Sequence, residues 1–482
     1  MRKIILTLII ISVFLSCDDR LEDLNRPTKA AVEVPAEPLF ANGVNEMYYM
    51  MNNSNTNINV FRLYAQYWAQ TTYPDESQYN MVGRRNPDNF WRGAYRDALK
   101  DLDEARKITL ATWENLGLTA AERDNRLAII DVNKVYIFAS LVDAFGAIPY
   151  QEALDPEVLQ PSYESGAAVY DQIIVLLDDA ITKMDPAADS WPAGQDPVYE
   201  GDTQGWLKFA NSLKLKLAIN ISDVQASKAA TMVSQAIAGG IFEDNADNAA
   251  ITYLDAFPNT HPIHEDLVQS GRADFVVANT LIDKLNALSD PRIAVFAEPL
   301  ADGVTYEGGV YGTNNTYAQK SHIGAIFHEP TLEGLILDYA EVEFMLAEAA
   351  EKGFSSPMSA EEHYDQGIRA SMEYWGVDDA DIDDYLANPG VAYTTAPGSF
   401  KQKIGTQHWI ALYNRGFEGW TVWRRLDFTG FNVPPLLSYS DIPNRFIFPI
   451  EEATLNKNNL TEAIQMIGGS DNVQTKVFWD IN

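Results

Sequence analysis

Helical patterning of apolar residues recurs along much of this 482-residue chain and limits the folds that it can adopt. Between Asn125 and Phe145, apolar side chains return at the spacing that places them on one face of a helix. The same spacing appears over about 165–184 and 204–222. Helices that each bury one face must pack against other helices, so we expect a mainly α scaffold over about 39–245.

Two further helices are predicted earlier in this region. The first should end before Pro74, because proline lacks the N–H that a helix interior needs; its shared face holds Phe61, Tyr64, Ala65, Trp68 and Ala69. The second should begin at Asp88, a residue type that caps helix N-termini; its apolar side holds Trp91, Ala94, Tyr95, Ala98, Leu102 and Ala105.

A helical hairpin is predicted again later in the chain. Leu337 to Glu351 and Ala360 to Trp375 are both amphipathic, and a short segment with Gly353 and Pro357 joins them. Small Ala residues alternate with aromatics on the facing sides, which is typical of tetratricopeptide units with a period of about 34 residues. We therefore expect tetratricopeptide-like hairpins over about 331–375, without a strict repeat.

The sequence pattern changes between about 246 and 330. Strand-like runs such as 250–253 mix with Gly and Asn clusters, above all over 302–315. The tail from 376 to 482 has similar irregular character, including Pro434 and Pro435. We predict one domain over 39–482, in which 246–330 and 376–482 form a loop-rich cap with short strands.

The N-terminus carries an export signal. Arg2 and Lys3 precede an apolar stretch that is too short to span a membrane, which is typical of a signal peptide over residues 1–16. Cys17, the only cysteine, follows the small residue Ser16, and we predict that it is lipidated. The match to the usual lipoprotein pattern is imperfect because Leu15 lies one place late, and a chance cysteine is the alternative. Residues 17–38 contain three prolines and are predicted to form a tether behind the lipid.

The charge balance excludes one class of partner. Removing residues 1–16 takes away two positive charges, which changes the formal net charge from −33 to −35. Affinity for nucleic acid comes mainly from Lys and Arg that neutralise phosphates, so we expect no nucleic-acid partner.

The sequence carries no recognisable catalytic motif. It contains no Gly-x-Ser-x-Gly elbow, phosphate loop or His-Glu-x-x-His pair. His261 and His264 flank Pro262 without a third ligand at metal-site spacing, so we predict neither a metal nor a cofactor. A glycosidase stays open as an alternative, because sequence spacing does not report how far apart two carboxylates lie in space.

Several stretches together resemble the SusD/RagB lipoproteins of Bacteroidetes. They are DAFGAIPY at 143–150, WLKFANSLKL at 206–215, DPR at 290–292, YAEVEFMLAEA at 339–349, QHWIALY at 407–413, EGWTVWRR at 418–425 and PNRFIFP at 443–449. We interpret their aromatic and arginine residues as architecture, because they lie in dense apolar surroundings; these are Trp409, Trp420, Trp423, Arg424 and Arg445.

The resemblance implies a function as well as a fold. It implies a cell-surface, lipid-anchored protein of the outer membrane that binds a nutrient without turning it over and forms a lid on a TonB-dependent transporter of the SusC type. The usual cargo in that family is an oligosaccharide, and some members take peptides. Asp18 and Asp19 directly after Cys17 fit display on the outer face in part.

Two loop regions offer aromatic rings beside polar side chains, the combination that a sugar needs. The loop before Asp88 offers Tyr73, Asp75, Gln78, Tyr79, Asn80 and Arg84, and the insertion offers Tyr306, Tyr311, Asn314 and Tyr317. We predict that these residues face solvent and contact the ligand. Binding of peptides, a lipoprotein glycosidase and an assembly-only scaffold are the alternatives.

Overall fold

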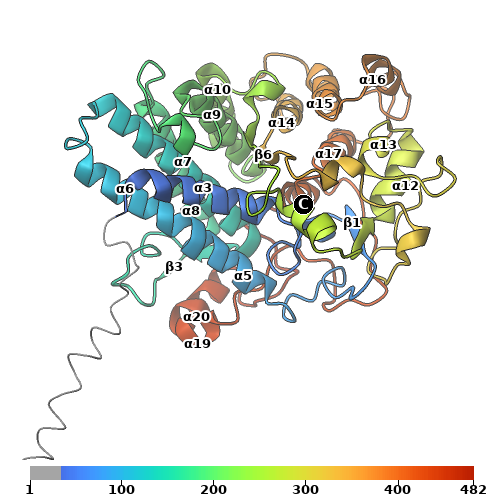
Figure 1. Cartoon of the computed structure of the whole chain (residues 1–482), viewed down its shortest axis with the longest axis horizontal. Coiled ribbons are helices and arrows are strands. Elements are labelled where there is room, and N and C mark those ends of the chain that lie inside the picture. Colours follow the sequence, from blue (N-terminus) through green and yellow to red (C-terminus); the bar gives the residue numbers. More distant parts are fainter. Residues whose placement is uncertain (1–33, 482) are drawn as a thin grey trace, which may run out of the picture.

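Paired helices form the framework of the structure, a computed structural model that describes residues 34–481 (Figure 1). The predicted signal peptide, Cys17 and most of the predicted tether lie outside the described residues. The helices are α3 (Ala36–Asn52), α4 (Phe61–Tyr64), α5 (Asn86–Arg92), α6 (Lys100–Thr112), α7 (Ala120–Phe145), α8 (Gly166–Lys183), α9 (Thr203–Asn220), α10 (Ala226–Gly239), α11 (Pro262–His264), α12 (Asn279–Leu288), α13 (Ile293–Phe296), α14 (Tyr339–Glu351), α15 (Ala360–Tyr374), α16 (Asp379–Leu386), α17 (Phe400–Ala411), α18 (Gly416–Leu426), α19 (Glu452–Leu455) and α20 (Lys457–Met466).

Short helices of other types and short strands complete the element order. Two π-helices are η1 (Gly93–Leu99) and η4 (Glu265–Gln269), and the 3₁₀ turns are η2 (Ala193–Gln195), η3 (Asn245–Asp247), η5 (Tyr317–Gln319) and η6 (Ala325–His328). The strands are β1 (Trp68–Gln70), β2 (Ala147–Pro149), β3 (Tyr163–Ser165), β4 (Ala249–Ile251), β5 (Phe275–Val277) and β6 (Gly334–Leu337).

The mainly α fold and the predicted hairpins are confirmed. α7 packs against α8, α9 against α10, and α14 against α15. Capping boxes start two of these helices: Thr119 and Glu122 begin α7, and Ser359 and Glu362 begin α15. None of the helices within residues 34–481 combines the length and apolar character of a membrane span.

The strands form three separate antiparallel pairs, β1 with β5, β2 with β3, and β4 with β6. In the first pair Trp68 lies opposite Val277, and Gln70 lies opposite Phe275. The pair therefore ties the loop after β1 to the insertion, although about 200 residues separate them along the chain.

The predicted helix through Trp68 and Ala69 is wrong. α4 ends at Tyr64, and Gln66 then takes a left-handed conformation with φ of 56°. The buried Gln66 side chain accepts from Thr280 Oγ1 (2.8 Å) and donates to the Asn432 carbonyl (2.8 Å). These long-range bonds, together with the pairing of β1, outweigh the helical spacing of the apolar residues.

Two predicted boundaries also change. α3 begins at Ala36, inside the segment predicted as a tether to residue 38, because Phe40, Val44 and Met47 pack on the core. The tail is not all cap, since α17 packs against α14, and α18 packs against α4 and α17. Both tail helices therefore belong to the scaffold, where their buried aromatic residues contact its core.

The motif residues of the tail are confirmed as architecture. The Arg424 guanidinium lies over the Trp420 ring at 3.6 Å and donates to the carbonyls of Asp143 (2.6 Å) and Asn444 (2.9 Å). Arg445 donates to the Phe145 carbonyl (3.1 Å). The end of α7 is thereby joined to α18 and to the segment after it. Trp409 and Trp420 are buried as well, and Trp423 is partly buried.

Candidate functional site

The loop 71–85 has an unusual backbone. Within residues 34–481, seven residues other than glycine have a left-handed conformation; three of them, Tyr73, Tyr79 and Arg85, lie in this loop, and a fourth, Gln66, lies just before β1. Such conformations are costly for side chains with a Cβ and persist only where surrounding contacts impose them. Their concentration makes this loop a candidate site.

Buried Gln70 holds the loop in shape. Its Nε2 donates to the Tyr73 carbonyl (2.9 Å) and to Glu76 Oε2 (2.6 Å), while its Oε1 accepts from Ser77 N (3.0 Å) and Ser77 Oγ (2.7 Å). Glu76 also forms an ion pair with Arg84. The loop is therefore ordered before any ligand arrives, which reduces the entropy lost on binding.

The structure brings the two predicted regions together. Gln78 Nε2 donates to the Gly312 carbonyl (2.9 Å), and Asn315 Nδ2 donates to the Gln70 carbonyl (2.9 Å). The rings of Tyr79 and Tyr311 lie 6.1 Å apart. The insertion therefore supports the loop after β1 through both polar and aromatic contacts.

Sequence reasoning missed a third segment at this place. Residues 432–438 approach the loop: Ser438 N donates to the Gln78 carbonyl (2.9 Å), and Pro434 lies against Gly312. Pro434 and Pro435 signalled an irregular tail, but nothing in their local sequence indicated which surface they would reach. We call the three segments 71–85, 306–317 and 432–438 the joined-loop surface.

Tyr79 and Tyr311 do not face solvent, and that part of the prediction is wrong. Tyr79 is fully buried, with its ring 5.1 Å from that of Tyr64 and its hydroxyl accepting from Gln66 Nε2 (3.1 Å). Tyr311 is 2% exposed and donates its hydroxyl to the Leu63 carbonyl (2.6 Å). Burial raises the pKa of Tyr79 to about 12. Both rings pack inside the junction and support it.

Three other predicted residues, Asn80, Tyr306 and Tyr317, are partly buried and contact the protein itself. Asn80 Oδ1 accepts from Gly83 N (2.9 Å), which closes its own turn. The Tyr317 ring stacks on His322 with centroids 3.8 Å apart. Tyr306 is partly buried, and its carbonyl accepts from Asn286 Nδ2 (3.3 Å). The partners of Tyr306 and Tyr317, Asn286 and His322, also belong to the insertion.

The remaining predicted residues are accessible. Tyr73 is 65% exposed, Asp75, Arg84 and Asn314 are exposed, and Gln78 is partly exposed. Large apolar side chains are also exposed on the same three segments: Val82, Val310, Val433 and Leu436. An aromatic ring and aliphatic groups beside carboxylate, guanidinium and amide groups suit a ligand with both apolar and polar faces.

The two histidines considered as metal ligands bond to the protein itself. His261 Nδ1 accepts from Ile263 N (3.0 Å) at the start of α11, and His264 Nδ1 lies 2.6 Å from the His328 carbonyl oxygen. Burial lowers the pKa of His261 well below its ordinary value. Within residues 34–481, no group of three or more His, Cys, Asp or Glu residues is arranged to hold a metal ion.

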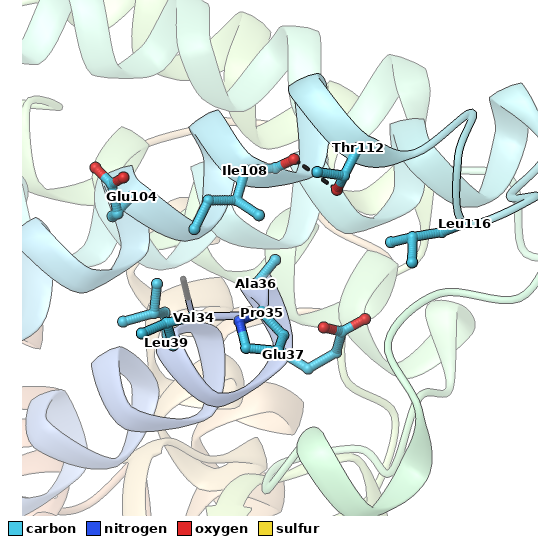
Figure 2. A pocket seen from close by; sticks show the side chains of 9 residues that line it. All are labelled: Val34, Pro35, Ala36, Glu37, Leu39, Glu104, Ile108, Thr112 and Leu116. Atoms are coloured by element: carbon cyan, nitrogen blue, oxygen red, sulfur yellow. Dashed lines mark hydrogen bonds between the residues drawn. The ribbon is translucent and has the colours of Figure 1, made fainter. Parts of the chain in front are cut away.

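A different groove, of about 720 Å³, lies where α3 begins beside α6 (Figure 2). Its walls are mainly aliphatic, with Val34, Leu39, Ile108 and Leu116 facing the space and Glu37 and Glu104 among its charged lining. None of the described residues that line it carries an aromatic ring. A sugar-binding site needs a stacking ring with polar groups around it, so this groove matches that chemistry less well than the joined-loop surface.

Comparison with known proteins identifies the family. Residues 27–449 match the model of the SusD-like family that is described as "Starch-binding associating with outer membrane". No curated protein matches the sequence. Because the family model spans most of the chain, the protein belongs to this SusD-like family.

Solved structures show the same fold. A chitin-binding protein is 26% identical, with a TM-score of 0.77 over 92% of this chain and 98% of its own. A SusD homologue from Bacteroides uniformis is also 26% identical, with a TM-score of 0.76 over 93% of this chain and 100% of its own. A SusD homologue from Parabacteroides distasonis is 23% identical, with a TM-score of 0.80 over 93% and 98% of the two chains.

Proposed function

We propose that this protein is a lipid-anchored binding protein of the outer cell surface, which captures an oligosaccharide and passes it to a SusC-like TonB-dependent transporter. The observation that carries the proposal is the exposed Tyr73 ring on a loop that internal hydrogen bonds and the insertion hold in place. The family description names starch, and one similar structure is a chitin-binding protein, which supports a carbohydrate ligand.

The binding step is argued from the chemistry of sugars. A pyranose ring presents C–H groups on one face, which stack on an aromatic ring, and hydroxyls around its edge, which need hydrogen-bond partners. Tyr73 supplies the ring, and Asp75, Arg84 and Asn314 are exposed polar groups on the same joined-loop surface. No covalent step is required, so capture and release follow from affinity alone.

Binding of starch and chitin oligosaccharides to the full-length chain tests the proposal. We expect Tyr73→Ala to lower the affinity for the oligosaccharide by about tenfold or more, because the substitution removes the aromatic ring on which the sugar stacks. Leu159→Ala is the matched control, since it truncates an exposed apolar side chain in a different part of the chain. Equal affinity of the wild-type protein and Tyr73→Ala would contradict the placement of the site.

The alternatives give different outcomes in the same assay. Shortening of the bound oligosaccharide, abolished by replacing a single carboxylate, would support a glycosidase. Binding of peptides but not of sugars would indicate that the ligand is a peptide. Copurification with a SusC-like transporter is expected in every case except the glycosidase, and copurification without any ligand binding would indicate an assembly-only scaffold.

A further inference from the structure

A groove of about 280 Å³ lies between α6, α7, α8 and the segment that follows β2. Its lining includes four charged side chains and two aromatic rings: Asp103, Arg106, Asp131, Lys134, Phe138 and Tyr150. None of these residues belongs to the joined-loop surface. In Figure 1, α6, α7 and α8 lie on the left of the molecule and β1 lies on the right. The groove is therefore separate from the site proposed above.

The charges that line the groove occur in pairs of opposite sign. Arg106 Nε donates to Asp131 Oδ1 (3.1 Å). Lys134 Nζ donates to Asp103 Oδ1 (3.0 Å), and Asp103 also pairs with Lys107 (2.8 Å). The described lining thus holds two carboxylates and two cations, with a formal charge of zero. A charged ligand would have to compete with these pairs, whereas a neutral ligand can leave them intact.

Asp131 presents one unpaired oxygen to the groove. The residue is only 4% exposed, and Arg106 bonds its Oδ1, but its Oδ2 accepts no hydrogen bond within residues 34–481. This oxygen is not sealed from solvent by the fold, and the groove is the space that Asp131 lines. Burial raises the pKa of Asp131, against the opposing effects of Arg106, Lys134 and Lys183. A hydroxyl group that donates to Oδ2 would stabilise the buried charge.

Aromatic and aliphatic side chains form the other part of the groove. The partly buried Tyr150 ring meets the buried Phe138 ring edge to face, with centroids 4.8 Å apart at an angle of 76°. Leu154 and Leu176 also line the space. Burial, together with Asp131, raises the pKa of the Tyr150 hydroxyl to about 12, so this hydroxyl keeps its proton and can donate. The groove thus offers apolar contact beside hydrogen-bonding groups.

A sugar ring matches this combination. Its hydroxyls donate and accept at once, so they can bond a carboxylate and a guanidinium without breaking the pair between them. The volume lies below the range of about 300–1,000 Å³ that encloses drug-sized ligands, which suits a single ring. We propose that this groove is a second saccharide subsite for one neutral pyranose ring, with Asp131 and Arg106 bonding the hydroxyls and Tyr150 contacting the C–H groups. The proposal rests on the proposed function only for the class of ligand.

Calorimetric titration of the full-length chain with glucose and N-acetylglucosamine tetrasaccharides counts the sites. We expect two sugars bound to each wild-type chain, and one to each chain of Tyr73→Ala or Tyr150→Ala. In the Tyr73→Ala background, Asp131→Asn should lower the remaining affinity by about tenfold, because asparagine keeps the shape and loses the charged acceptor. Asp124→Asn is the matched control, since Asp124 also pairs with an arginine of α7, Arg123 (2.7 Å), and does not line the groove.

Tyr150→Phe guards against a simple loss of fold. It keeps the ring, so it should retain the second sugar that Tyr150→Ala loses, while thermal unfolding of both variants stays close to that of the wild type.

Two outcomes would overturn the proposal. One is a single bound sugar that Tyr73→Ala removes and Tyr150→Ala leaves unchanged, a result that would still support the joined-loop surface. The other is a groove that binds a free amino acid, such as leucine, more tightly than any sugar, since the charge pairs would then hold a zwitterion. Sugar binding that Tyr150→Ala removes and Tyr73→Ala does not affect would support the groove and contradict the joined-loop site instead.

Discussion

The Tyr79 side chain illustrates how one residue can serve a binding surface from beneath it. Its ring packs between Tyr64 and Tyr311, and its hydroxyl accepts from Gln66. Gln66 also bonds Thr280 and Asn432, so the hydroxyl belongs to a network that joins the insertion and the tail. The contacts that bury Tyr79 in the core therefore also support the loop.

Truncation of Tyr79 should therefore act through stability. Tyr79→Ala is expected to lower the free energy of unfolding by about 3–5 kcal/mol, because it empties the volume of a fully buried ring. Tyr79→Phe keeps the ring and should cost only about 1 kcal/mol for the hydrogen bond to Gln66. Urea unfolding of both variants measures the difference, and a stable Tyr79→Ala that loses only ligand binding would refute this role.

His408 is a buried residue that makes the stability of the fold depend on pH. Its imidazole stacks on Phe344 with centroids 5.2 Å apart, and neither ring nitrogen has a hydrogen-bond partner within residues 34–481. Burial lowers the pKa of His408 from 6.5 to about 3, in spite of the opposing effect of Glu341. The folded protein therefore keeps this imidazole neutral under conditions in which the unfolded chain protonates it.

The sign of the resulting pH dependence follows from this difference. As the pH falls from about 6.5 to about 3, the unfolded state takes up a proton that the folded state does not, so stability decreases. His408→Leu should flatten the loss of stability over that range and leave stability near pH 7 little changed, because the ring nitrogens have no partners to lose. Unfolding midpoints measured across this pH range would show an unchanged slope if the prediction is wrong.

At the scale of elements, the joined-loop surface depends on close approach between segments that are distant in sequence. Gly312 has φ of 74°, and a Cβ at this position would lie 2.5 Å from Pro434 Cβ. The glycine is required twice, once for the left-handed backbone and once for the contact with the tail. Its carbonyl also accepts from Gln78 (2.9 Å), so its position affects all three segments.

Gly312→Ala is expected to destabilise the protein by about 1–3 kcal/mol and to weaken oligosaccharide binding, because it separates the tail from the insertion. Gly303→Ala is the matched control: its φ is 76°, but no atom lies within 4 Å of the added Cβ. Thermal unfolding and ligand affinity are measured for both variants. Gly303→Ala reports the effect of the strained backbone alone, and the additional effect in Gly312→Ala reports the clash with Pro434. Equal effects on affinity would show that the approach of Pro434 does not matter.

The whole scaffold is held together by charges as well as by apolar packing. Lys216 of α9 bonds Glu341 of α14 (3.0 Å) and Glu418 of α18, and Arg415 bonds Asp338 (2.8 Å) and Glu341. Burial acts to raise the pKa of Glu341, but Lys216 and Arg415 lower it to about 2. Buried charges in a network of this kind favour one arrangement of three helices, because each is costly without its partners.

Membrane attachment is expected to be independent of this scaffold. Cys17 precedes the described residues, and the first helix within residues 34–481, α3, begins at Ala36. Cys17→Ala should release the protein from the membrane while leaving its unfolding midpoint and ligand affinity unchanged, because it removes only the acyl anchor. Fractionation of cells that lack the neighbouring transporter provides the measurement, and retention of the variant in membranes would contradict the lipid anchor.

Local periodicity and helix-breaking residues were enough to predict most of the long helices. Helices α8, α9, α14 and α15 begin and end within two residues of the predicted positions, because their apolar spacing and breaking prolines or glycines act over short distances. Helix α7 ends where predicted but begins at Ala120, five residues before the predicted start. The architectural role of Trp420 and Arg424 was also predictable from their apolar surroundings.

The exposure of each loop residue depends instead on long-range contacts that local sequence does not encode. Tyr73 and Tyr79 lie six positions apart in one polar loop and look equivalent in sequence, yet one is 65% exposed and the other fully buried. Left-handed residues set the direction of each side chain, and the insertion and the tail cover one ring while leaving the other free. The end of α4 at Tyr64 has the same origin, because bonds from Gln66 to residues more than 200 positions away outweigh the local helical pattern.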